Sequence, residues 1–242
     1  MKNKTLFLFW GLLFITSLSS AQKLHIGLGG GFGTFKMSDS RNLNQTVIES
    51  LPFGTNLTDD FPPYFLYNGE IIYSFPKIFS LGIKASTTST GSRVCVSDYS
   101  GSYVFDNLQK VYTSGLKAMT GTFPGHKQGI CFSLEGGVIW SFLSLKEDFT
   151  VFDKSTNSVT DYRAFGYYVQ PGIDYLWQVM PWLMVGGNLS YFKGFPNNYY
   201  LKDDKEKTLY NTKTNKPISP QWDGVRASIS VYYQVIRKKD KK

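Results

Sequence analysis

The chain has 242 residues, of which 17% are aromatic and 18% are charged, and this composition excludes an intrinsically disordered chain. The formal net charge of +8 does not indicate a nucleic-acid partner, because Lys2 and Lys4 contribute two positive charges and residues 237–242 (RKKDKK) contribute a net four. The remainder is nearly balanced and shows no shift in composition, so we expect a single domain.

The first 21 residues have the pattern of a secretory signal peptide. Lys2 and Lys4 precede the apolar run 6–15, and Ser-Leu-Ser-Ser-Ala then leads to a cleavage site after Ala21. The apolar run is shorter than the ~20 residues that a membrane-spanning helix needs. An N-terminal core helix is the alternative. We predict a signal peptide at 1–21, one domain at 22–236 and a basic tail at 237–242.

A glycine-rich stretch, residues 24–35 (LHIGLGGGFGTF), opens the predicted mature chain. It does not fit the phosphate-binding pattern G-x-G-x-x-G, because Phe32 or Thr34 stands where the third glycine belongs. Apolar side chains instead alternate with glycines, starting at Leu24 and Ile26. This period of two predicts a β-strand.

Period-two patterning recurs along the rest of the chain, in eight segments separated by turn signals. The segments lie near residues 23–35, 64–75, 78–90, 103–120, 129–144, 162–177, 181–194 and 222–236. Long connections (36–63, 91–102, 145–161 and 195–221) alternate with tight turns at 76–77, 124–127 and 178–180. This layout predicts an all-β fold, an eight-stranded antiparallel up-and-down barrel whose long loops share one end.

The two faces of these segments differ in the size of their side chains. One face carries large apolar residues such as Phe132, Ile173 and Val231, whereas the other carries mainly glycine and serine. A water-facing surface normally has many charged residues, so small side chains fit a crowded interior better. We therefore predict a transmembrane barrel with its apolar face toward lipid and its glycines as inward-facing spacers. A soluble ligand-binding barrel is the alternative.

The pattern of residues 22–236 resembles the small eight-stranded outer-membrane barrels of the outer-membrane protein A and X type. The resemblance implies an outer-membrane location, extracellular long loops, periplasmic termini, and lipid and lipopolysaccharide as surroundings. Other outer-membrane proteins are possible partners. One departure is the carboxy terminus, where the resembled families often end on an aromatic residue but this chain continues with RKKDKK.

Six charged residues point inward in this register, three acidic and three basic. They are Glu70, Lys84, Lys117, Glu135, Asp174 and Arg226. Balanced signs in a narrow lumen indicate ion pairing. A hairpin centred on Lys77 places Glu70 opposite Lys84, and a five-residue turn would place Lys117 opposite Glu135. We interpret the set as a structural polar network; a gate or selective conduit is the alternative.

Catalytic and metal-binding patterns are weak in this sequence. His25 and His126 both fall at the short-turn end, and neither has a serine and a carboxylate placed to form a triad. Cys95 and Cys131 show no metal-binding spacing, and we expect them too far apart for a disulfide. We predict no enzyme activity, cofactor or metal site. Calcium at Asp59-Asp60 or Asp203-Asp204 is an open alternative.

The longest loop, residues 195–221, combines tyrosines with charges of both signs. Its candidate contact residues are Tyr199, Tyr200, Asp203, Asp204 and Tyr210. We therefore predict an interaction protein, either an accessory subunit of a larger outer-membrane assembly or a surface-contact protein. The alternatives are a small transporter or binding barrel for a hydrophobic ligand and, less favoured, a lipid-modifying enzyme.

Overall fold

The structure is a computed structural model that describes residues 23–51, 56–75, 79–97, 99, 101–122, 127–152 and 154–235. The predicted signal peptide at 1–21, the basic tail at 237–242, the turn at 76–77 and His126 lie outside these residues.

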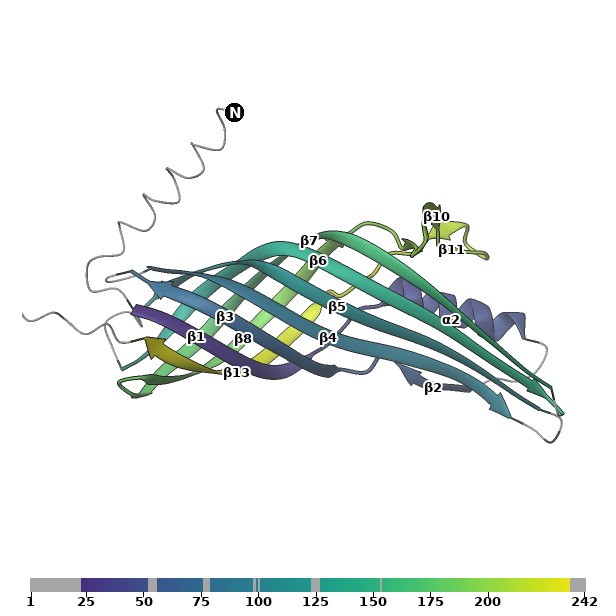
Figure 1. Cartoon of the computed structure of the whole chain (residues 1–242), viewed down its shortest axis with the longest axis horizontal. Helices are drawn as coiled ribbons and strands as arrows, with labels where there is room; N and C mark the ends of the chain where they lie inside the picture. The colour runs from purple at the N-terminus through teal and green to yellow at the C-terminus, as the bar shows by residue number, and fades with distance from the viewer. Residues whose placement is uncertain are drawn as a thin grey trace, which may run out of the picture.

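Eight long strands close into one antiparallel ring (Figure 1). They are β1 (Lys23–Gly33), β3 (Tyr64–Ser74), β4 (Phe79–Ser97), β5 (Gly101–Gly121), β6 (Gln128–Val151), β7 (Lys154–Met180), β8 (Leu183–Pro196) and β13 (Gly224–Val235). Each strand pairs with its neighbour along the chain, and β13 pairs with both β8 and β1 to complete the ring. The predicted eight-stranded up-and-down barrel is confirmed.

The barrel carries its large apolar side chains on the outside. Leu28, Phe132 and Ile229 are 73%, 65% and 66% exposed, although each lies within a strand of the barrel. Such a continuous apolar exterior is stable against acyl chains and not against water. Among the described residues, no helix is both long and apolar enough to cross a bilayer.

The glycines of β1 act as the predicted spacers. Gly27 lies between Glu70 of β3 and Tyr232 of β13, and a Cβ atom there would come within 2.4 Å of the Tyr232 ring. Glycine is therefore required at this position so that the Tyr232 ring can occupy the lumen.

Two of the predicted long loops are instead continuations of the strands. β4 and β5 remain paired up to Ser97 and Ser102, and β6 and β7 up to Val151 and Lys154. The predicted loops 91–102 and 145–161 are therefore wrong. Beyond the lipid-facing band, the outer face of these strands no longer needs apolar side chains. The alternation of apolar residues therefore ends there, although the backbones of the strands remain paired.

We call this four-stranded continuation the extension, comprising residues 89–97, 101–110, 142–151 and 154–163. It projects beyond the barrel at the end opposite the tight turns (Figure 1). At ~3.3 Å per residue, it reaches about 30 Å past the last residues of the surrounding strands.

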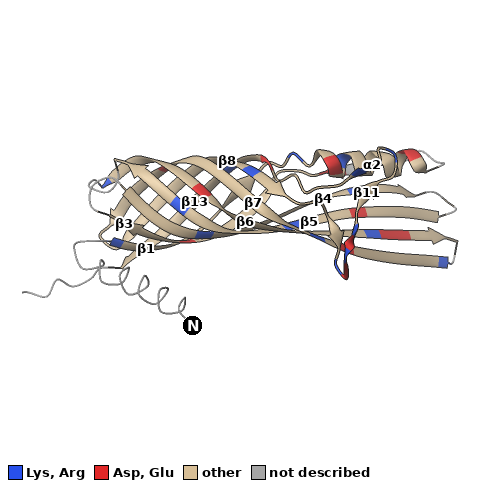
Figure 2. Cartoon of the chain, turned by 90° about the horizontal axis from the view of Figure 1, so that it is seen from above, with Lys and Arg blue, Asp and Glu red and all other residues tan. Residues whose placement is uncertain are grey.

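The helix α2 (Ser38–Ser50) lies alongside the extension (Figure 2) and covers its inner face. The Asn44 amide donates to Ser92 Oγ at 2.7 Å, and the Gln109 amide donates to Ser40 Oγ at 2.6 Å. The buried residues of α2 are thus polar, which is why no apolar helical period marks it in the sequence.

Short strands line the remaining connections. They are β2 (Asn56–Asp60), β9 (Tyr200–Leu201), β10 (Asp204–Thr208), β11 (Tyr210–Asn211) and β12 (Lys216–Pro217). β2 pairs with β4 and β9 pairs with β7, so the two edges of the extension are partly covered.

Candidate functional site

The barrel interior is filled by side chains in successive layers. Nearest the tight turns is an apolar layer, which we call the lower layer: Ile72, Met119, Cys131, Leu176, Met184 and Tyr232. Toward the extension follows the charged layer, and then a second apolar cluster, the upper layer: Phe35, Met37, Phe61, Val111, Ile139, Tyr168, Phe192 and Trp222. The order is visible along β5, where Met119, Lys117 and Val111 all point inward.

All six predicted inward charges lie buried in the lumen, each at most 5% exposed. Lys117 is at the centre: its Nζ donates to Asp174 Oδ1 at 2.8 Å and to Glu70 Oε2 at 3.2 Å. Lys84 Nζ donates to Glu135 Oε2 at 2.9 Å. Two buried phenols complete the layer, with Tyr232 donating to Glu70 and Tyr168 to Glu135, both at 2.5 Å.

The predicted partners within this layer need correction. Glu70 does lie opposite Lys84, and Lys117 opposite Glu135, in the strand register. The salt bridges nevertheless join Lys84 to Glu135 and Lys117 to Glu70 and Asp174. Ring closure explains the difference, because long side chains in a narrow barrel reach strands beyond their paired neighbour.

Arg226 departs from the predicted ion-pair network. Its guanidinium carbon lies 3.6 Å from the centre of the Phe192 ring, a cation–π contact. Within the described part of the chain, Arg226 forms no salt bridge, and its Nε and Nη2 atoms have no hydrogen-bond partner. Arg226 therefore belongs to the boundary between the charged layer and the upper layer.

The comparison with solved structures finds similarity to outer-membrane proteins at low sequence identity. A major outer membrane protein from Thermus thermophilus is 13% identical, with a TM-score of 0.51, over 89% of this chain and 100% of that chain. The chain has the fold of the small outer-membrane β-barrels. OprG from Pseudomonas aeruginosa is 10% identical (TM-score 0.45, 89% and 96% covered). Ail, the attachment invasion locus protein of Yersinia pestis, is 11% identical (TM-score 0.38, 88% and 97% covered).

No model of a protein family matches the sequence of this barrel, and no curated protein matches it.

The predicted contact loop of the barrel is only partly available at the surface. Tyr199 is fully buried, and its hydroxyl donates to Gln109 Oε1 at 2.9 Å; burial raises the pKa of this phenol well above its ordinary value. It packs with Leu143, Ala164 and Ile218 against the inner face of the extension. The prediction that Tyr199 is a contact residue is therefore wrong, because Tyr199 anchors the loop to the extension.

The other loop candidates are nearer the surface. Tyr200 pairs with Arg163 of β7 and is half-buried, whereas Asp203 and Tyr210 are exposed. Hydrogen bonds from the Glu206 backbone and from Lys207 lower the pKa of Asp204. Asp204 is thus an ionised carboxylate in a local turn.

The residues considered for catalysis and metal binding are dispersed. His25 is buried in β1, and neither of its ring nitrogens has a hydrogen-bond partner in the described structure. Cys95 and Cys131 lie opposite Val104 and Gly121 of β5, which at ~3.3 Å per residue are roughly 55 Å apart. Within the described ranges, no three His, Cys, Asp or Glu side chains are grouped to hold a metal ion.

Replacing Glu70 with glutamine is expected to lower the stability of the barrel by about 1–3 kcal/mol, because Lys117 loses one of its two carboxylates in a buried site. Thermal unfolding in detergent micelles measures the effect, with the exposed Glu206→Gln as the control. An unchanged melting temperature for Glu70→Gln would contradict the role of this ion pair.

Proposed function

We propose that this barrel is a non-enzymatic cell-surface contact protein that binds a partner through the far end of its extension. The proposal includes an orientation in which the tight turns face the periplasm and the extension faces outward. The extension supports it, because four paired strands reach about 30 Å beyond the barrel and are braced on their inner face by α2. A rigid projection of this kind can hold a binding surface away from the membrane.

The observation that carries the proposal is an apolar group at the tip of the extension. Phe152 is 77% exposed in the turn after β6, and Tyr99 is fully exposed in the turn after β4; these turns are neighbours, because Gly101 lies opposite Val151. Phe152 lies ten residues beyond Phe142 of β6, about 33 Å farther from the lipid-facing band. Large apolar side chains grouped in water mark interaction surfaces.

The backbone of Phe152 strengthens this reading. Its φ angle is 50°, in the left-handed region that disfavours a bulky side chain and favours asparagine or glycine. The aromatic ring therefore does not help the turn to form, and its exposure means that it gains little from packing. Contact with a partner protein would account for an aromatic ring at this position, whereas formation of the turn does not.

The rival function, transport of a hydrophobic solute through the lumen, fits these residues less well. A solute would have to pass the buried salt bridges of Lys84 and Lys117 and then the tightly packed upper layer around Trp222. Both large surface cavities of the barrel, moreover, include outward-facing residues in their lining, such as Phe142 in one and Tyr67 in the other.

The test is a double variant, Phe152→Asn with Tyr99→Ser. We expect it to fold as well as the native barrel, because asparagine suits the left-handed backbone, and to lose proteins that cross-link to the native extension. Quantitative mass spectrometry after cross-linking on intact cells measures the loss, which should be at least about tenfold. Tyr210→Ser, an exposed aromatic on β11, is the matched control.

Two results would contradict the proposal. One is an unchanged set of cross-linked proteins in the double variant. The other is a steady conductance of the native barrel in planar bilayers, because a lumen filled by the three layers should not pass ions.

A further inference from the structure

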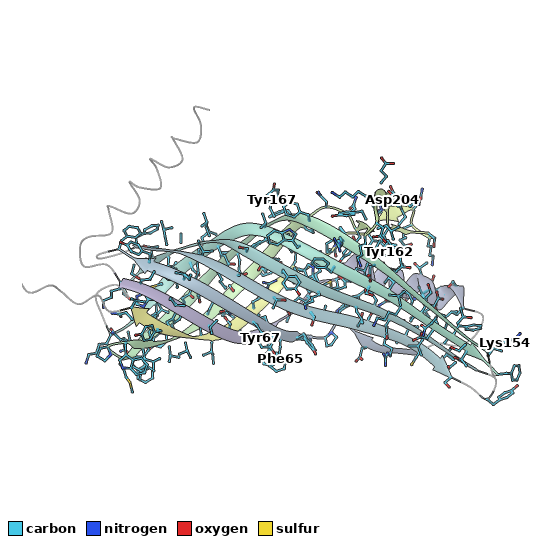
Figure 3. All side chains as sticks on the ribbon, in the orientation of Figure 1. Phe65, Tyr67, Lys154, Tyr162, Tyr167 and Asp204 are labelled. Atoms are coloured by element: carbon cyan, nitrogen blue, oxygen red, sulfur yellow. The ribbon has the colours of Figure 1, made fainter. Side chains whose placement is uncertain are left out.

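A cavity of about 720 Å³ opens on the outer face of the barrel where the extension begins. Its floor is a row of paired residues on three adjacent strands: Lys110 of β5, Phe142 of β6 and Arg163 of β7. Tyr162 and Lys202 complete one side of it, and Figure 3 shows Tyr162 at the junction of β7 with the β9–β10 segment. The cavity is thus a hollow in the outer wall and is separate from the lumen.

Two cations in this cavity have no salt bridge within the described residues. They are Lys110 and Arg163, and each lies over an aromatic ring. Lys110 Nζ lies 4.9 Å from the Tyr112 ring centre, and the Arg163 guanidinium carbon lies 5.7 Å from that of Phe142.

The remaining cations of the cavity are already paired. Arg93 makes a bidentate pair with Asp106 at 2.6 and 2.7 Å, and Lys202 bonds Asp161 at 3.4 Å. Asp59, on the β2 side, is the remaining carboxylate of the lining. The excess positive charge therefore sits at the centre of the floor, on both sides of Phe142.

The position of these cations along the strands indicates what they face. Two residues toward the barrel, the same three strands carry an outward aromatic row, Tyr112, Trp140 and Phe165, paired side by side. Below that row the exterior is apolar, with Leu116 and Leu134 exposed at 68% and 55%. Aromatic side chains are enriched at the boundary between acyl chains and headgroups, so Lys110 and Arg163 lie in the headgroup layer.

We propose that this cavity binds the phosphate-bearing headgroup of an outer-leaflet lipid. Lys110 and Arg163 would contact the phosphate oxygens, and the acyl chains would extend past the aromatic row onto the apolar wall. Cations directly above a lipid-facing surface suit a ligand with a charged head and an apolar tail better than a free anion. The assignment rests on the orientation in the proposed function and not on a protein partner.

The test compares Lys110→Gln/Arg163→Gln with Lys154→Gln/Lys216→Gln. Both double variants remove two exposed positive charges, but Lys154 lies at the tip of the extension (Figure 3) and Lys216 on β12. Binding of lipid A to the full barrel in nanodiscs of phosphatidylcholine is measured by native mass spectrometry. We expect affinity for lipid A to fall at least about tenfold in the first variant only.

Dephosphorylated lipid A should bind the native barrel as weakly as lipid A binds the first variant. Equal affinity of lipid A for both double variants would overturn the site. Displacement of lipid A by an equimolar concentration of inorganic phosphate would overturn the lipid assignment, because the cavity would then recognise a soluble anion. Phe152→Asn/Tyr99→Ser should keep full lipid binding, which separates a failure of this site from a failure of the proposed function.

Discussion

Replacing Lys117 with methionine is expected to lower the stability of the barrel by about 3–5 kcal/mol, the largest effect of any single charged residue. Lys117 is 2% exposed and bridges Asp174 and Glu70. Methionine fills a similar volume but leaves two carboxylates close together without a counter-charge. Burying such a charge without a partner costs far more than the ion pair itself contributes.

Urea unfolding of the barrel in detergent micelles, followed by tryptophan fluorescence, measures this loss. Lys154→Met, at an exposed position of β7, is the control and should leave the midpoint unchanged. Adding Asp174→Asn to Lys117→Met should restore part of the stability, because it removes one of the stranded charges. A Lys117→Met variant as stable as the native barrel would exclude a structural role for the charged layer.

Replacing Trp222 with alanine should also destabilise the barrel by about 3–5 kcal/mol, because it opens a cavity in the upper layer. Trp222 is fully buried, packs edge-on against Phe35 with ring centres 5.2 Å apart, and donates from Nε1 to Ser141 Oγ at 2.9 Å. The residue precedes β13 and joins the last connection to the barrel interior.

The same unfolding measurement, with circular dichroism as the probe, tests this second prediction. Trp222→Phe keeps most of the ring but loses the indole N–H, so it should fall between Trp222→Ala and the native barrel. Trp182→Ala, at an exposed ring near the tight turns, removes the same side chain without a cavity and should cost much less. Equal losses for Trp222→Ala and Trp182→Ala would show that the upper layer adds no packing energy.

The strand order, the inside-out distribution of side chains and the inward position of the six charged residues could all be predicted from the sequence. Each depends on the alternation of side chains along a strand, which is a local property. The register at Gly27, where only glycine fits beside Tyr232, follows from the same alternation.

Only the tertiary structure decided which residues meet across the lumen and how far the strands extend. Lys117 pairs with Glu70 and Asp174 because closure of the ring brings non-neighbouring strands within reach of a long side chain. The extension and α2 could not be predicted from apolar periodicity, because their outer surfaces face water and their buried contacts, such as that of Asn44 with Ser92, are polar. Tyr199 likewise lies in a loop that the sequence predicts to be exposed, but this loop folds back onto the extension and buries it. Alternation records which face a side chain takes, but contacts between distant segments depend on how the whole chain closes.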